Sequence, residues 1–192
     1  MSIFCDKDLN LILASASPRR SEIMKLAGYD FKVVPSFADE TVIPVPKTPH
    51  EFVEKLSRIK AEEVFSRNPD ACVIGADTVV VLNDNILGKP KDDEDAFLML
   101  KSLSGNTHTV YTGVSILSKN KQVTFHEATF VTFNSLSDDE IRCYLKTSEH
   151  RDKAGAYGIQ GYGSVFVSHI EGCYFNVMGL PISKLYNALK EF

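Results

Sequence analysis

Short apolar runs alternate along the chain with longer segments in which apolar residues recur at helical spacing. The apolar runs predict strands at 11–13, 31–34, 71–82, 109–118, 123–133, 164–170 and 174–178, and a return strand within 86–90. The periodic segments predict helices at 18–28, 49–67, 92–103, 138–146 and from 181 onward. This alternation predicts an α/β protein with a mixed sheet, too irregular for a simple doubly wound fold.

Local signals mark the starts of three of these helices. Ser17 fits an N-cap position, and Pro18 follows it at the first helical position, where a missing N–H costs nothing. Thr48 and Ser137 are each followed three residues later by a glutamate, which is the spacing of a capping box. We therefore expect helices to begin directly after Ser17, Thr48 and Ser137, with both capping boxes formed.

The composition is that of an ordinary globular protein. The 192 residues fit one domain or two closely joined lobes, and 44% hydrophobic with 24% charged residues are usual values. The formal net charge of −4 argues against a general nucleic-acid binder, which usually carries a basic balance. A local basic pocket for a small anion is still compatible with this charge.

Cysteines and apolar segments indicate the compartment. Cys5, Cys72, Cys143 and Cys173 are widely scattered, without a CxxC pair or zinc-like histidine spacing, which favours free thiols in a reducing compartment. No apolar run approaches the roughly 20 residues of a membrane span, and the first residues lack a signal-peptide pattern. We therefore expect a cytoplasmic protein that binds neither membranes nor nucleic acid.

Two basic residues occupy an unfavourable place at a helix start. Arg19 and Arg20 come directly after Pro18, where the helix macrodipole already carries roughly half a positive charge. They are either a solvated surface pair or, together with free backbone N–H groups, a binding site for phosphate. The strand–turn–helix context favours phosphate, because ligand sites in α/β proteins gather at the carboxyl ends of strands.

Lys60 falls inside the apolar arc of the predicted helix at 49–67, almost in line with Val53 and Leu56 on a helical wheel. One interpretation is a lysine that lies along the edge of the core with its ammonium in solvent. The other is a cation directed into a cleft, toward phosphate. Glu63 also falls in the arc, so the helix can equally be leaving the core at this point.

Asp77 interrupts the apolar run 71–82, where an ionised carboxylate costs several kcal/mol unless it is paired, hydrogen-bonded or bound to a metal. It is either satisfied by backbone donors or serves as a catalytic base or metal ligand. Glu40, after the strand at 31–34, can supply a second carboxylate. Two carboxylates facing several cations are typical of a magnesium–phosphate site.

The segment 151–163 contains four glycines within residues 155–163, so its backbone must turn tightly or lie close to another group. It is either a simple connector or a loop whose amides, Tyr157 and Gln160 contact a nucleobase. Its glycines are not in the order of a dinucleotide fingerprint, and the chain contains no P-loop motif.

Several segments occur in a specific order from about Leu11 to the C-terminus: "LASASPRR", "FADET", "IGADTVV" with "LGKP", "LSGNTHTVYTGV", "RDKAGAYGIQGYG" and "VMGLP". In this order and spacing they resemble the Maf family of nucleoside triphosphate pyrophosphatases. The resemblance covers nearly the whole chain and implies one domain at 1–192. It also implies an elongated mixed β-sheet with flanking helices and two lobes around a central cleft, similar to the inosine triphosphate pyrophosphatases.

The resemblance further implies a house-cleaning hydrolase that splits the α–β phosphoanhydride of a nucleoside triphosphate, uses a divalent cation (Mg²⁺ or Mn²⁺) and often forms a homodimer. Matched by motif, Asp77 is implied as the proton acceptor, and Glu40 matches one of the charged cleft residues of the family. The two carboxylates, Glu40 and Asp77, are the expected metal ligands. The residues implied to bind substrate are Arg19, Arg20, Lys60, Thr78, Lys89 and Gln160.

The form "DKAGAYGIQG" resembles the branch that acts on dTTP and UTP, with a sister branch on 7-methyl-GTP as the alternative. In the implied mechanism the cations neutralise the phosphate oxygens, and Asp77 deprotonates the attacking water directly or through a metal. Two rivals stay open: a sensor that binds triphosphates without turnover, and a nucleotidyl transferase. Asp77 argues against the sensor, because a carboxylate repels the ligand unless a metal intervenes.

Overall fold

The computed structural model describes residues 9–43 and 48–192. Cys5 and the first residues, on which the signal-peptide expectation rests, lie outside the described residues. The chain forms two compact units. Unit 1 comprises Met1–Asp77, Thr112–Glu127 and Gly179–Phe192, and unit 2 comprises Thr78–Tyr111 and Ala128–Met178.

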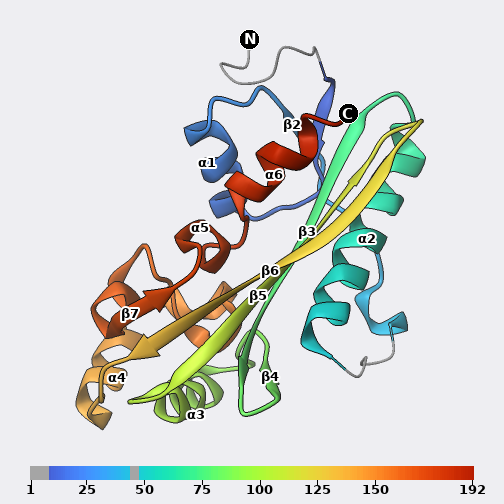
Figure 1. The fold of residues 1–192 in the computed structure, drawn as a ribbon. Helices are drawn as coiled ribbons and strands as arrows, with labels where there is room; N and C mark the ends of the chain where they lie inside the picture. The colour runs from blue at the N-terminus through green and yellow to red at the C-terminus, as the bar shows by residue number, and fades with distance from the viewer. Residues whose placement is uncertain (1–8, 44–47) are drawn as a thin grey trace. The chain divides into compact units, whose positions relative to one another are not determined.

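The described residues form a seven-stranded mixed sheet in the order β2-β1-β3-β5-β6-β7, with β4 paired to β3 (Figure 1). The strands are β1 (Leu11–Leu13), β2 (Lys32–Val33), β3 (Cys72–Leu82), β4 (Asn85–Leu87), β5 (Thr107–Leu117), β6 (Gln122–Phe133) and β7 (Val167–Glu171). β1 is parallel to both its neighbours, with Leu13 opposite Val33 and Ile74. β4 and β7 pair antiparallel with β3 and β6. The predicted mixed sheet is confirmed.

Each predicted helix forms close to its expected start. The α-helices are α1 (Pro18–Leu26), α2 (Pro49–Arg67), α3 (Asp93–Leu103), α4 (Asp138–Leu145), α5 (Tyr174–Val177) and α6 (Ile182–Leu189). Short 3₁₀ turns are η1 (Glu40–Val42), η2 (Glu149–Asp152), η3 (Ala154–Ala156) and η4 (Tyr162–Phe166). In the described part of the chain, no helix combines the length and apolar character needed to cross a membrane.

The capping predictions are only partly right. Ser137 forms its capping box, with its hydroxyl accepting from the Glu140 N–H and the Glu140 carboxylate accepting from the Ser137 N–H. Ser17 and Thr48 do occupy N-cap positions, but their side chains make no capping hydrogen bond among the described contacts. The Thr48 hydroxyl lies 3.3 Å from Nε2 of His50 instead, so the predicted capping box there is wrong.

The strand predicted at 174–178 is also wrong, because these residues form the short helix α5. Asn176 is fully buried, and its side-chain amide donates to the Val110 carbonyl and to the Thr129 hydroxyl. The Cys173 N–H also donates to the Thr129 hydroxyl. Thr129 on β6 is therefore hydrogen-bonded to both Cys173 and Asn176. These long-range polar contacts favour a helical turn over the extended conformation that the apolar residues predict.

In unit 1, α2 packs directly on the backbone of β3 and β5. A Cβ on Gly75 would lie 2.2 Å from the Ser57 carbonyl oxygen, and one on Gly113 would lie 2.3 Å from the Val53 carbonyl group. Both positions therefore require glycine. The buried residues of this layer include Ile12, Ala14, Ala61, Val64, Val73 and Leu117. The close approach brings the face of α2 that carries Lys60 against the middle of β3.

Unit 2 has its own apolar core beneath α3 and α4. Its fully buried members include Leu100, Leu103, Val110, Val131, Phe133 and Ile141. The ring of Tyr144 packs edge-on against Phe166 at 5.0 Å, and Phe133 packs edge-on against Tyr157 at 4.8 Å. This core supports the glycine-rich segment predicted at 151–163.

Candidate active site

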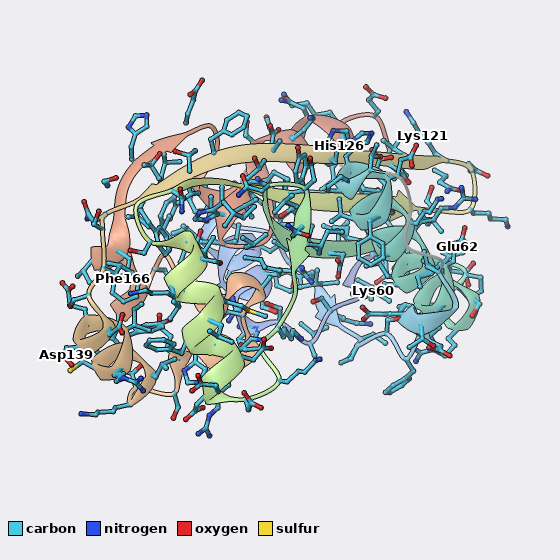
Figure 2. The ribbon with its side chains drawn as sticks, turned by 90° about the horizontal axis from the view of Figure 1, so that it is seen from below. Lys60, Glu62, Lys121, His126, Asp139 and Phe166 are labelled. Carbon is cyan, nitrogen blue, oxygen red and sulfur yellow. The ribbon has the colours of Figure 1, made fainter. Side chains whose placement is uncertain are left out.

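A cluster of opposite charges lies in unit 1, where Lys60 of α2 bridges two carboxylates. Its Nζ lies 2.6 Å from Oδ1 of Asp77 on β3 and 3.0 Å from Oε1 of Glu40 in η1. The side chains of Lys60 and Asp77 are only 14% and 13% exposed, whereas that of Glu40 is 53% exposed. Lys60, labelled in Figure 2, is therefore directed at carboxylates rather than along the edge of the core into solvent.

Asp77 stands where β3 changes from buried to half-buried. The strand is buried from Cys72 to Ala76 and again from Val79 to Val81, with Asp77 and Thr78 between these stretches. Lys60 is the partner that the structure shows for the Asp77 carboxylate. A carboxylate in this place is stabilised by its ion pair and still partly open to solvent, which a base or a metal ligand requires.

Arg20 belongs to the same cluster and is not a solvated surface residue. Its Nε donates to the Gly179 carbonyl at 2.9 Å, and its Nη1 donates to the Ser15 hydroxyl at 2.9 Å. Burial lowers the pKa of Arg20 below its ordinary value. The negative charges of Asp77 and Glu40 oppose that shift of the pKa, and the positive charge of Arg19 adds to it. Burial and a second guanidinium both destabilise the charged form of an arginine. An anion that binds beside it therefore stabilises that form.

Sequence reasoning missed the two groups that hold Arg20. Ser15 also accepts the Ser17 N–H at 3.2 Å, so its hydroxyl fixes both the turn after β1 and the arginine. The only local signal was a small polar residue in the turn between β1 and α1. The Gly179 carbonyl could not be found locally, because it lies 159 residues away along the chain.

The donor set fits a divalent cation that is shared with phosphate. Among the described residues, no group of three or more His, Cys, Asp or Glu side chains has the geometry of a metal site. Mg²⁺ in phosphate sites is held by one or two carboxylates, with waters and substrate oxygens as its other ligands. Glu40 and Asp77, both within 3.0 Å of one ammonium nitrogen, already have oxygens directed at a common cation.

The other predicted residues, Thr78, Lys89 and Gln160, belong to unit 2. Thr78 is half-buried on β3, while Lys89 and Gln160 are exposed. Within this unit, the Gly155 N–H donates to the Gly88 carbonyl at 3.0 Å, which ties the glycine-rich segment to the residue before Lys89.

The interpretation of Tyr157 as a base-contacting residue is wrong. Its side chain is buried, and its hydroxyl lies 2.8 Å from Nε2 of His108 in the core of unit 2. Burial raises the pKa of Tyr157 and lowers the pKa of His108 to about 4, so both groups are neutral near pH 7. The tyrosine therefore anchors the glycine-rich segment to the core.

Cysteine chemistry agrees with the sequence prediction as far as the described residues reach. Cys72, Cys143 and Cys173 are free thiols. Burial raises the pKa of Cys72 to about 11, so this thiol is an inert packing group.

Known proteins are similar to this chain along nearly its whole length. The model of a family described as "Maf-like protein" matches residues 10–192. A Bacillus cereus protein named dTTP/UTP pyrophosphatase is 50% identical over 182 residues, which are 95% of this chain and 95% of its own. A relative of the same name from another Bacillus cereus strain is 51% identical over 182 residues, 95% of this chain and 89% of its own.

Among solved structures, the Staphylococcus aureus Ham1 protein is similar, with a TM-score of 0.52 and 15% sequence identity. The match covers 95% of this chain and 98% of that one. At this identity the likeness shows the fold alone. It confirms the expected mixed α/β fold, which this chain shares with the Ham1 protein.

Proposed function

Because the chain belongs to the Maf family, we propose that it hydrolyses dTTP and UTP to the nucleoside monophosphate and pyrophosphate. One observation carries the proposal: Lys60 bridges Glu40 and Asp77 beside the partly desolvated Arg20. Cations and carboxylates gathered in one place meet the two needs of anhydride hydrolysis, neutralisation of phosphate charge and activation of water.

The phosphate groups bind the cations of the cluster. An anhydride resists attack because its negatively charged oxygens repel a nucleophile, and Arg19, Arg20 and Lys60 reduce that repulsion. Arg19 and Arg20 lie in the first turn of α1, where the positive end of the helix macrodipole also attracts an anion. Arg20 is held by Ser15 and Gly179, so it is oriented before substrate arrives and loses little side-chain entropy on binding.

Asp77 orients and deprotonates the water that attacks the α-phosphorus. The Lys60 ammonium donates to its Oδ1 at 2.6 Å, which fixes the orientation of the carboxylate that is to accept the proton. Glu40 and Asp77 would hold the divalent cation, Mg²⁺ or Mn²⁺, which when bound supplies further charge neutralisation and acidifies water. In this arrangement the Asp77 carboxylate accepts the proton of the attacking water.

The residues of unit 2 supply substrate choice. Lys89 is an exposed cation available to a phosphate oxygen, and Gln160 is an exposed amide on a glycine-rich loop. An amide donates and accepts at once, which matches the adjacent N3–H and carbonyl groups of uracil and thymine. Cytosine presents an acceptor and a donor in those places, and the mismatch costs about 1–3 kcal/mol. Thr78, next to Asp77, completes the proposed binding residues.

Pyrophosphate release from UTP, dTTP, CTP, ATP, GTP and 7-methyl-GTP, with and without Mg²⁺ or Mn²⁺, tests the proposal. We expect UTP and dTTP to be the best substrates and a chelator to reduce turnover by at least about 10²-fold. Preference for 7-methyl-GTP would assign the chain to the sister branch. Binding without turnover would identify a sensor, and transfer of the nucleotide to an acceptor would identify a transferase. The single domain at 1–192, the homodimer and the cytoplasmic location stay predictions.

A further inference from the structure

The glycine-rich segment of unit 2 is wrapped around a single carboxylate, that of Glu149 in η2. Oε2 accepts the Tyr162 N–H at 2.8 Å, and Oε1 accepts the Gly163 N–H at 3.2 Å. Oε1 also accepts the Tyr144 hydroxyl at 3.1 Å. The carboxylate therefore joins the end of α4 to the start of η4, on either side of the loop that carries Gln160.

Two glycines of the segment let side chains approach its backbone closely. A Cβ on Gly161 would lie 2.0 Å from Oε2 of Glu149. A Cβ on Gly158 would lie 2.6 Å from Cε of Lys153 and 2.8 Å from Oε1 of Glu149. Gln160 stands between these glycines and is exposed. The turn is closed by the Gly161 N–H donating to the Gly158 carbonyl at 3.3 Å. The conformation around Gln160 thus follows the position of the Glu149 carboxylate.

The surroundings of Glu149 keep it an acceptor. Burial and, after it, the charge of Glu149 raise the pKa of Tyr144, so the tyrosine stays a hydroxyl donor. Tyr144 itself is fixed by its edge-on contact with Phe166 (labelled in Figure 2), which ends η4. The Lys153 ammonium donates to the Glu149 carbonyl at 2.6 Å, which holds the backbone of η2.

We propose that Glu149 is a positioning residue for base selectivity: it holds the loop so that the Gln160 amide meets the pyrimidine edge in one orientation. This inference rests on the proposed function, because selectivity is defined by the triphosphate that is hydrolysed. Glu149 acts without touching the base, through the backbone amides of Tyr162 and Gly163.

Glu149→Gln is the informative variant. The side chain keeps its size but has one acceptor oxygen and an NH₂ donor, so one of the two backbone N–H groups faces a donor. Tyr144→Phe is a milder variant that removes one donor and keeps both backbone contacts. Asp139→Asn is the matched control, because Asp139 is an exposed carboxylate on α4, labelled in Figure 2.

The first measurement is hydrogen exchange in the nucleotide-free protein. We expect the amides of Tyr162 and Gly163 to exchange at least about tenfold faster in Glu149→Gln, less so in Tyr144→Phe, and unchanged in Asp139→Asn. Unchanged exchange in Glu149→Gln would overturn the inference. Because no nucleotide is present, this comparison stands whether or not the proposed function is correct.

The second measurement is the ratio of kcat/KM for UTP to that for CTP, which does not depend on the fraction of folded enzyme. We expect this ratio to fall by about five- to tenfold in Glu149→Gln, mainly through a higher KM for UTP. The ratio should fall less in Tyr144→Phe and should not change in Asp139→Asn. Faster exchange with an unchanged ratio would mean that Glu149 stabilises the loop without positioning Gln160, and would overturn the inference. Wild-type protein that releases no pyrophosphate from UTP or dTTP would refute the proposed function instead.

Discussion

Replacement of Asp77 by Asn separates the stabilising and catalytic roles of the charge cluster. Breaking a fully buried ion pair costs about 3–5 kcal/mol, because one charge stays buried without a partner. Here Lys60 keeps Glu40 at 3.0 Å, and the Asn oxygen can still accept from the ammonium 2.6 Å away. We therefore expect Asp77→Asn to lower the free energy of unfolding by only about 1–2 kcal/mol.

The same substitution should reduce turnover by at least about 10²-fold, since an amide cannot accept the proton of the attacking water. Without a divalent cation, affinity for the triphosphate should hold or increase, because one negative charge is removed from beside the phosphates. The assays are pyrophosphate release at saturating UTP and unfolding in urea. Glu62→Gln is the matched control, because Glu62 is an exposed carboxylate of α2 paired with Arg58 at 2.7 Å. Turnover of Asp77→Asn within about threefold of wild type would refute the assignment of Asp77.

Variants of Arg20, Lys60 and His108 test the other contacts of the two units. Arg20→Ala should lower the free energy of unfolding, measured in urea, by about 1–3 kcal/mol, and Arg19→Ala should lower it by less. Both variants should raise KM for UTP. Lys60→Met should destabilise more than Asp77→Asn, because two carboxylates lose their shared ammonium. Below pH 6.5 the unfolded chain protonates His108 while the folded protein, with a pKa of about 4, does not. Stability should therefore fall by up to about 3 kcal/mol between pH 6.5 and 4, and a His108→Gln variant should lose that dependence.

Local signals predicted most of the fold. Helices began where Ser17, Thr48 and Ser137 placed them, even though two of these side chains make no capping bond among the described contacts. The prediction of a strand at 174–178 was wrong, because the conformation there depends on contacts of Asn176 with residues 47 and 66 positions away along the chain. Periodicity reflects only residues that are neighbours in the sequence. It therefore contains no information on the long-range hydrogen bonds of a buried side-chain amide.

The candidate site was predicted less completely than the fold. Charges in apolar surroundings identified Asp77 and Lys60, since such placement is costly without a partner. That the two are each other's partners depends on the close approach of α2 to β3 at Gly75, which no local pattern encodes. The role of Glu149 was not predicted for the same reason. A glutamate in a polar segment has no distinctive sequence signal, and its contacts form only when the loop folds around it.

The charge balance of the cluster connects its resting state to its chemistry. Arg19, Arg20 and Lys60 supply three positive charges, and Glu40 and Asp77 supply two negative charges, which leaves one net positive charge. In the nucleotide-free protein the ion pairs of Lys60 with Asp77 and Glu40 offset part of the desolvation penalty of the cluster. A triphosphate brings more negative charge than one net positive charge can offset, so substrate binding needs additional cations. In the proposed function the two carboxylates would attract a divalent ion, and the ion pair with Lys60 would then give way to a metal–phosphate site.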